Sequence, residues 1–303
     1  MGFSGLLPMR ARNPYYCVII CTTLLLFIIN LHAPRQIVLV ECRPLCGIGN
    51  QMFQYAAGLA ARNQHPETCV FGAEGVGLDS HPGSSLLRHA DVVNMPPLAP
   101  CHLRFWGWWR LEYEATMYMG LARRFHPPCY RYVPFDFNSS VVITGYLQSY
   151  KYFENLTRPF FRLKQHASAA QWLAERNITS VAHVRRGDML LDGSPVAPAA
   201  YYERALRSLG SPKIAVCTDD PQWVRSQAVF AGAAISTGHG AGFDLALMAA
   251  ATDAIIVGVG TFGWWGAYLS EAKNKVIYRV QARDPQGEYN EADFIPDGWI
   301  VLD

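Results

Sequence analysis

The sequence predicts an α/β protein that follows a single membrane-spanning segment at its N-terminus. The chain has 303 residues, half of them hydrophobic, which by size is enough for about two domains. An uncharged apolar run near the N-terminus has the length of a short transmembrane helix. In the second half of the chain, helical patterns alternate with short apolar runs. This alternation is typical of a parallel sheet that helices cover on both faces.

The apolar run Tyr15–Leu31 is expected to be an uncleaved signal anchor that spans residues 15–32. Arg10 and Arg12 precede it, which favours a cytosolic tail of residues 1–14 and a body on the far side of the membrane. A cleaved signal peptide stays open as the alternative. The run is longer than a usual signal core, and no clear small-x-small cleavage site follows it.

Glycosylation acceptors and cysteines fit a lumenal body. Triplets of the acceptor type begin at Asn138, Asn155 and Asn177. Six cysteines follow the apolar run, and in an oxidising compartment they allow up to about three bridges with about 15 connectivities. These are Cys42, Cys46, Cys69, Cys101, Cys129 and Cys217. No C-x-x-C pair occurs, so a structural zinc site is not expected.

The charge balance argues against a nucleic-acid partner. There are 26 basic and 24 acidic residues, which gives a net charge of +2. A generic nucleic-acid binder would normally show a basic face or stripe. The adjacent arginines Arg185 and Arg186 are therefore expected to serve one local site and not to belong to an extended basic surface.

The first domain is expected to cover residues 36–158 and to begin with a buried strand and a glycine turn. Residues 64–100 are rich in Gly, Pro and Ser and predict mostly loop. The expected elements and segments, in order, are a strand at Gln36–Cys42, a turn and helix within Cys46–Asn63, an aromatic block at Phe105–Gly120 and a strand at Val141–Thr144.

The second domain is expected to cover residues 159–303, with Pro159 near its start. Its helices and strands alternate regularly, which predicts a parallel sheet. The expected helices are His166–Arg176, Ala199–Leu209, one starting at Pro221 with Asp220 as its cap, Phe243–Thr252 and Phe262–Ser270. The expected strands are Ser180–Val184, Lys213–Cys217, Ala254–Val257 and Lys275–Tyr278.

Three polar or glycine-bearing loops follow strands of this second sheet. They are His183–Arg186, Thr218–Asp219 and Gly258–Trp265. Ligands of open parallel sheets bind beyond the carboxyl ends of the strands. The three loops are therefore expected to meet at one edge and to form the ligand site.

Arg185 and Arg186 are the strongest indication of an anionic ligand. A guanidinium group offers a rigid fork of donors that matches phosphate oxygens. Two arginines in tandem at a strand end should point to opposite sides. We expect one to meet the ligand and the other to pair with a carboxylate such as Asp188. A solvated strand end is the plainer alternative.

Three further side chains near this edge each have a structural alternative. Thr261 begins a helix. Taken alone it is better explained as a simple helix cap, but beside the arginines we expect it to favour an anion, through the free N–H groups and the dipole of the helix start. Asp244 lies in the first turn of a helix, where the dipole alone favours an acidic residue. His183 alternates with apolar strand neighbours, so a core histidine with its hydrogen bonds made is the default explanation.

The segment Gly47–Gln51 in the first domain lacks a full dinucleotide-binding fingerprint. It predicts a tight turn that presents amide side chains.

Taken together, four segments resemble the alpha-1,2-fucosyltransferases of glycosyltransferase family 11. Their order and spacing agree with that family, and the resemblance covers nearly everything after the anchor. The segments are GIGNQMFQYA (Gly47–Ala56), TGYLQSYKYFEN (Thr144–Asn155), HVRRGD (His183–Asp188) and DLALMAAATDAIIVGVGTFGWWGAYLS (Asp244–Ser270). Cys46 stands where a glycine is common and Met189 where an aromatic residue is common, and residues 64–100 match poorly.

The resemblance implies a GT-B-like arrangement of two facing Rossmann-like domains behind a Golgi type II anchor. It implies GDP-fucose as the donor substrate, the 2-hydroxyl of a terminal galactose on a glycan as the acceptor, inversion at the sugar carbon and no metal or other cofactor. The first domain would be the acceptor side and the second would bind the donor. Two alternatives stay open: a fucosyltransferase with a different acceptor, either another sugar position or protein Ser/Thr, and an inactive carbohydrate-binding protein. A homodimer also stays open.

The resemblance also implies the site residues. His183 and Asp244 would contact the guanosine, and Asn50 would reach across from the first domain toward the diphosphate or sugar. The donor-binding set is His183, Asp244, Thr261, Phe262, Asn50 and Gly49, and the catalytic set is Arg185, Arg186 and Asp188. The general base stays open between Asp188, His183 and Glu112.

Overall fold

The computed structural model describes residues 38–42, 47–64, 69–72, 93–94, 123–136, 141–156, 161–279 and 289–303. The predicted anchor, the aromatic block at 105–120, Glu112 and the acceptor at Asn138 lie outside these ranges. Within them, no helix combines the length and the apolar character that a bilayer crossing requires. The predicted domain boundary falls at 157–160, which is also outside the described residues.

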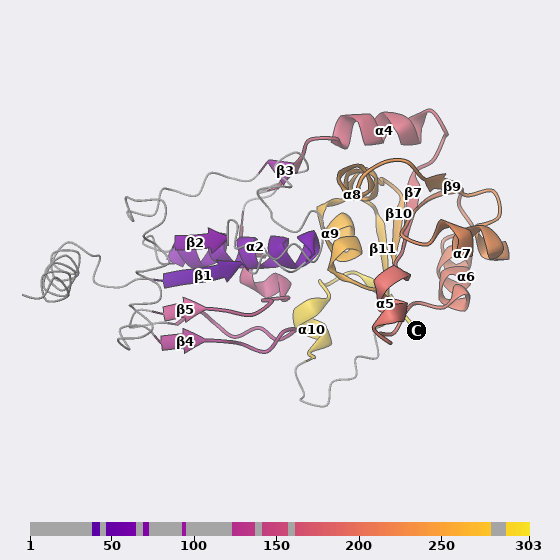
Figure 1. Ribbon diagram of the computed structural model, residues 1–303. Coiled ribbons are helices and arrows are strands. Elements are labelled where there is room, and N and C mark those ends of the chain that lie inside the picture. The colour runs from indigo at the N-terminus through magenta and orange to yellow at the C-terminus, as the bar shows by residue number, and fades with distance from the viewer. Residues whose placement is uncertain are drawn as a thin grey trace, which may run out of the picture.

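The first part of the chain forms a four-stranded parallel sheet in the order β2-β1-β5-β4. Its strands are β1 (Val38–Cys42), β2 (Cys69–Gly72), β4 (Arg123–Phe125) and β5 (Val141–Ile143). Helix α2 (Ile48–Gln64) lies against it, and its buried residues include most of its length. The carboxyl ends of these strands point toward the second part of the molecule (Figure 1).

The second part forms a six-stranded sheet, and each of its strand pairs is parallel. Its strands are β7 (Ser180–Val184), β8 (Ile214–Thr218), β9 (Ala234–Ser236), β10 (Ala254–Val257), β11 (Asn274–Tyr278) and β12 (Ile300–Leu302). The order β9-β8-β7-β10-β11-β12 is 3-2-1-4-5-6 when the strands are counted along the chain. This order is that of the Rossmann fold. The predicted α/β class is confirmed, with a parallel sheet in each unit, while the predicted transmembrane helix lies outside the described residues.

The helices of the second part follow the predicted alternation. They are α4 (His166–Ala174), α5 (Gly187–Leu191), α6 (Ala199–Ser208), α7 (Pro221–Ser226), the 3-10 turn η3 (Ala228–Phe230), α8 (Ala241–Ala249), α9 (Thr261–Leu269) and α10 (Glu291–Phe294). Helix α7 starts as predicted: Asp220 accepts a hydrogen bond from the backbone N–H of Trp223 at 3.0 Å, and Pro221 occupies the first turn. Between the two sheets, β3 (Val93–Asn94) pairs with β6 (Arg162–Leu163), and the 3-10 turn η2 covers Tyr150–Tyr152.

The two parts share an aromatic core. Phe53 of α2 packs against Trp264 and Trp265 of α9, with ring centroids 4.5 Å and 5.0 Å apart. Phe153, which follows η2, lies 5.3 Å from Trp265. All four side chains are fully buried. Because large aromatic side chains dominate the free energy of burial, this cluster fixes α2 relative to α9.

The C-terminal helix α10 returns to the first part. The carboxylate of Asp293, which is 6% exposed, accepts from Lys151 Nζ at 2.8 Å and from the backbone N–H of Tyr132 at 2.9 Å. Ser149 donates to the backbone carbonyl of Asp293 at 2.6 Å. A buried carboxylate needs such partners, so the end of the chain is anchored across both units.

Candidate active site

The candidate site lies where the strand order of the second sheet reverses, between β7 and β10. The chain leaves β7 toward β8 and β9 on one side and returns to β10 on the other. His183 near the end of β7 pairs in register with Val257 at the end of β10. The loops that follow these two strands contain the arginines and Gly258–Thr261, so the structure brings them to one edge, as predicted.

Both arginines are paired with carboxylates. Arg185 bridges Asp188, at 2.5 Å, and Asp219. The Nε of Arg186 lies 3.2 Å from Asp220, and its guanidinium stacks on Trp223, 4.0 Å from the ring centroid. The predicted pairing of an arginine with a carboxylate such as Asp188 is confirmed, and it extends to both arginines, because carboxylates from the start of α5 and from the loop after β8 surround them.

The two arginines differ in access. The Arg185 side chain is 34% exposed and its stem lies 4.0 Å from the position of a Cβ at Gly260, in the loop after β10. The Arg186 side chain is 15% exposed and is directed toward α7. Arg185 is thus the guanidinium that a ligand at the strand reversal can reach, while Arg186 holds the loop against its neighbour.

His183 is buried against the start of α9. It is 4% exposed, its ring centroid lies 5.7 Å from that of Phe262, and a Cβ at Gly263 would collide with its Nδ1. This Nδ1 has no hydrogen-bond partner among the described residues. The prediction that His183 is a core histidine with its hydrogen bonds made is therefore wrong for Nδ1. Burial lowers the pKa of His183 to about 4, so the imidazole is neutral near pH 7.

The buried His183 predicts a loss of stability in mild acid. The unfolded chain binds a proton below about pH 6.5, whereas the folded chain does so only near pH 4, so unfolding takes up a proton within this window. The free energy of unfolding therefore decreases as pH falls from 6.5 to 4, by about 3 kcal/mol at most from this group. Urea unfolding at pH 7 and pH 5 measures it. His183→Asn should flatten the difference, and the exposed His166→Asn should leave it unchanged.

Asp244 lies in the first turn of α8, as predicted, beside the end of β9. It accepts a hydrogen bond from Ser236 Oγ at 2.5 Å. Burial raises the pKa of Asp244, and the hydrogen bond from Ser236 opposes that rise. The buried thiol of Cys217 donates to the backbone carbonyl of Asp244 at 3.6 Å. The carboxylate therefore sits at the same sheet edge as His183, two strands away.

Thr261 links the two parts of the molecule. Its predecessor Gly260 has a φ of 92° and provides no side-chain cap for α9. Thr261 Oγ1 instead donates to Asn50 Oδ1 at the start of α2, at 2.7 Å. The alternative of a simple helix cap is wrong, because the hydroxyl bonds to the other unit.

The start of α2 forms the tight turn that the sequence predicts. The carbonyl of Gly47 accepts the backbone N–H of Asn50 at 3.0 Å. A Cβ at Gly49 would lie 2.6 Å from the backbone carbon of Thr261, and the Gly49 carbonyl accepts from Trp265 Nε1 at 2.9 Å. Gly49 thus allows the N-terminal ends of α2 and α9 to touch, and the two helices lie side by side (Figure 1).

Sequence reasoning missed the partners that hold these groups. Asp219 was expected at the edge but not as a partner of Arg185, and Trp223 was not expected to stack on Arg186. Gln148 was not singled out, although its Nε2 donates to Asn50 Oδ1 at 2.7 Å. The adjacent carboxylates Asp219 and Asp220 after β8 could have indicated the partner of Arg185. Nothing in the local sequence indicates the contact between Gln148 and Asn50, which lie 98 positions apart.

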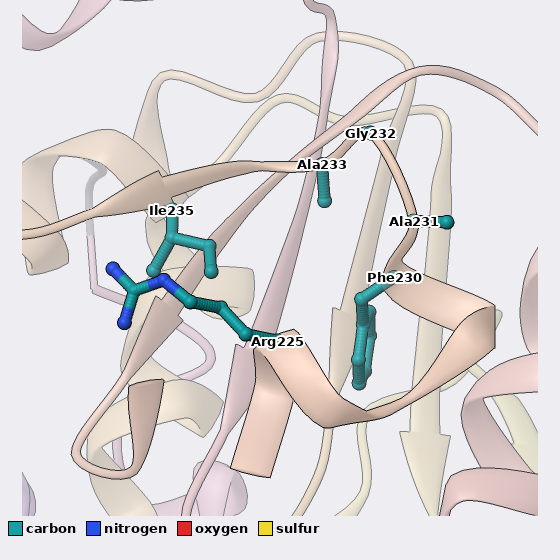
Figure 2. A pocket seen from close by; sticks show the side chains of 6 residues that line it. All are labelled: Arg225, Phe230, Ala231, Gly232, Ala233 and Ile235. Carbon is teal, nitrogen blue, oxygen red and sulfur yellow. The ribbon is translucent and has the colours of Figure 1, made fainter. Parts of the chain in front are cut away.

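Two surface cavities of the second unit lie away from this edge. One has a volume of about 350 Å³ and is lined by Arg225, Phe230, Ile235 and Ala231–Ala233 (Figure 2). A neighbouring one of about 480 Å³ shares Ala231–Ala233 and is lined by Lys213 and Ile214, at the amino end of β8. Ligands of parallel sheets bind at the opposite, carboxyl edge, so these hollows are not the candidate site.

The arginines and α9 lie in a part of the chain that matches a known protein family. The model of "Glycosyl transferase family 11" matches residues 144–303, which include the arginines and α9. A galactoside 2-alpha-L-fucosyltransferase of Caenorhabditis elegans is 27% identical, over 84% of this chain and 77% of that protein. The O-antigen biosynthesis glycosyltransferase WbnK of Escherichia coli is 23% identical, over 84% and 98%. The galactoside alpha-(1,2)-fucosyltransferase 2 of Oryctolagus cuniculus is 25% identical, over 84% and 74%.

Solved structures show only distant similarity. The crystal structure of POFUT1 in complex with GDP gives a TM-score of 0.43 at 12% identity, over 80% of this chain and 98% of that one. The NodZ alpha-1,6-fucosyltransferase soaked with GDP-fucose also gives 0.43, at 13% identity, over 78% and 93%.

Proposed function

Because this chain belongs to glycosyl transferase family 11, the family of the alpha-1,2-fucosyltransferases, we propose that it moves L-fucose from GDP-fucose to the 2-hydroxyl of a terminal galactose on a glycan. The names of the worm and rabbit relatives support the donor sugar and the linkage. The observation that carries the proposal is the position of Arg185. It lies at the strand reversal of a Rossmann-type sheet, beside the N-terminus of α9.

The donor would lie along the carboxyl edge of the second sheet. Its guanosine would extend toward His183 and Asp244, where a carboxylate can accept from the N–H edge of guanine. Its diphosphate would lie between Arg185 and the first N–H groups of α9, with Phe262 at the same helix start. Asn50 would reach the diphosphate or the fucose from the first unit. The arrangement is GT-B-like, with the acceptor held by the first unit.

The reaction would be a single displacement with inversion at the sugar carbon. The bond between that carbon and the diphosphate oxygen breaks, and the acceptor oxygen forms the new bond from the opposite face. Arg185 and the helix N–H groups offset the negative charge on the departing GDP. Their contribution is largest in the transition state, so they raise the rate and do not merely bind the substrate.

The proton of the acceptor hydroxyl must pass to a base. The Asp188 side chain is 46% exposed beside Arg185, whereas His183 is only 4% exposed. We assign the proton to Asp188. Its ion pair with Arg185 holds the Asp188 carboxylate at the site, where it takes up the proton while the departure of GDP carries most of the barrier.

The Arg185 guanidinium and the first N–H groups of α9, placed at the diphosphate, would also make a divalent cation unnecessary. Among the described residues, no three His, Cys, Asp or Glu side chains are grouped so that they could hold a metal ion. The carboxylates nearest the site, Asp188, Asp219 and Asp220, are engaged by the arginines. For localisation we keep the proposal of a Golgi type II membrane protein, which rests on Tyr15–Leu31 and the preceding arginines.

One assay tests the proposal. The purified body is incubated with GDP-fucose and a panel of galactose-terminated acceptors, with and without EDTA, and the product is analysed by NMR. We expect transfer to the galactose 2-hydroxyl with inversion, at a rate that EDTA does not change. Loss of transfer in EDTA would contradict the metal-free mechanism. Donor hydrolysis with no glycan product would point to another acceptor, and absence of GDP binding would refute the donor assignment.

A further inference from the structure

The amide oxygen of Asn50 is fully occupied. It accepts from Gln148 Nε2 at 2.7 Å and from Thr261 Oγ1 at 2.7 Å. A carbonyl oxygen has two lone pairs, and both are used here. If the amide turned over, its own N–H groups would face the Gln148 donor. The two bonds therefore fix the orientation of the Asn50 side chain.

The amide nitrogen of Asn50 remains available. Among the described residues it has no hydrogen-bond partner, and the side chain is half-buried at the start of α2. The nitrogen points away from the two groups that hold the oxygen. Asn50 thus presents two N–H donors at the edge where α2 meets α9, and such donors suit an anionic or hydroxylated ligand.

Gln148 does not owe its position to its own hydrogen bonding. It is 4% exposed, and its Oε1 is buried without a partner among the described residues. An orphaned buried acceptor costs about 1–3 kcal/mol. A hydrophobic side chain of the same shape would avoid this cost. What Gln148 supplies in return is the bond from its Nε2 to Asn50.

The backbone before Gln148 is held in an uncommon conformation. Gly145 has a φ of 105°, and Leu147, which is fully buried, has a φ of 54°. The surroundings fix this turn: Gln54 Nε2 donates to the Gly145 carbonyl at 2.6 Å, and the Gln148 N–H donates to the Cys129 carbonyl at 2.9 Å. Strained backbone that several contacts enforce is typical of functional sites.

We propose that Gln148 is a positioning residue: together with Thr261 it holds the Asn50 amide so that the Asn50 N–H groups address the diphosphate or fucose of the donor. The proposal rests on the proposed function. It makes donor recognition depend on both units, because Asn50 and Gln148 belong to the first and Thr261 to the second. Gln148 itself need not touch the substrate.

Gln148→Met tests the positioning role. Methionine matches the length of glutamine, removes the bond to Asn50 and also removes the orphaned oxygen. We expect kcat/KM for GDP-fucose to fall by about 10–100-fold, the range found when residues that orient metal ligands are replaced. The KM for the acceptor and the Tm should stay close to those of the unchanged enzyme. Unchanged kcat/KM for GDP-fucose would overturn the proposal.

Gln54→Met is the matched control. Gln54 is also buried and bonds to the same turn, but its Nε2 donates to the Gly145 carbonyl and not to the Asn50 amide. Its loss leaves the Gly145 carbonyl without that donor, so the Tm should fall while the KM for GDP-fucose changes little. If both glutamine variants showed the same loss of Tm and of activity, Gln148 would be merely structural.

Two Asn50 variants separate this inference from the proposed function. Asn50→Asp keeps both accepted bonds but presents an anionic oxygen, so GDP binding measured by calorimetry should weaken at least as much as in Gln148→Met. In the background of Asn50→Ala there is no amide left to hold, and adding Gln148→Met should cause no further loss. Additive losses would refute the positioning role alone. If the protein without any substitution did not bind GDP, the proposed function would be refuted instead.

Discussion

Replacing Arg185 with alanine is expected to reduce kcat/KM for GDP-fucose by at least about 10³-fold, the scale seen when a charged group is removed from a phosphoryl or oxyanion site. The change removes the guanidinium nearest the strand reversal. It also releases Asp188 and Asp219, whose carboxylates then repel the diphosphate. Steady-state kinetics and GDP calorimetry on the same preparation measure both effects.

Three variants place this result. Arg185→Lys keeps the charge but not the fork, so it should recover only part of the rate. Arg186→Ala should also impair activity, and it should lower the Tm because the stack on Trp223 is lost. Arg176→Ala removes another arginine that stacks on a tryptophan, away from the site, and should keep normal kinetics. Near-normal turnover in both Arg185→Ala and Arg186→Ala would contradict the mechanism.

Gly49→Ala is expected to have the second largest effect, on activity and stability together. The added Cβ would lie 2.6 Å from both the backbone carbon and the Oγ1 of Thr261. Backbone cannot move aside as a flexible side chain does, so α2 and α9 must separate. We expect a loss of about 1–3 kcal/mol in the free energy of unfolding, as for other overpacked sites. The bond from Thr261 to Asn50 should break, and donor binding should weaken with it.

Gly47→Ala provides the matched control two residues earlier. A Cβ at Gly47 would meet nothing within 4 Å. Thermal unfolding and GDP calorimetry of the two alanine variants should therefore differ sharply, with Gly47→Ala close to the unchanged protein. Equal behaviour of the two would show that the contact between α2 and α9 does not support the site.

The elements that carry the site were predictable because they are central strands. The bounds of β7 and β10 coincide with those predicted, since both strands are buried along their whole length and consist mainly of apolar residues. The edge strands β9 and β12 were not predicted. Each has three residues and is only partly buried, so neither leaves a clear apolar run.

The sequence was sufficient to predict which side chains of the second unit form the candidate site, but not which residues hydrogen-bond to them. Arg185 and Thr261 follow strands at positions where ligands bind, which their sequence context indicates. Their contacts to Asp219 and Asn50 join positions 34 and 211 residues apart. No periodicity or cap signal spans such distances, because these contacts depend on how the two sheets are placed.

The carboxylates around the arginines have a consequence for selectivity among anions. Three aspartates, Asp188, Asp219 and Asp220, face two guanidinium groups, so the protein already neutralises its own cations there. A small inorganic anion must compete with these aspartate carboxylates for the guanidinium groups, and it makes no other contact that would favour its binding. A nucleotide sugar has further anchoring groups along the sheet edge and can win that competition. Cellular phosphate should therefore be a poor inhibitor, although it carries the same kind of charge.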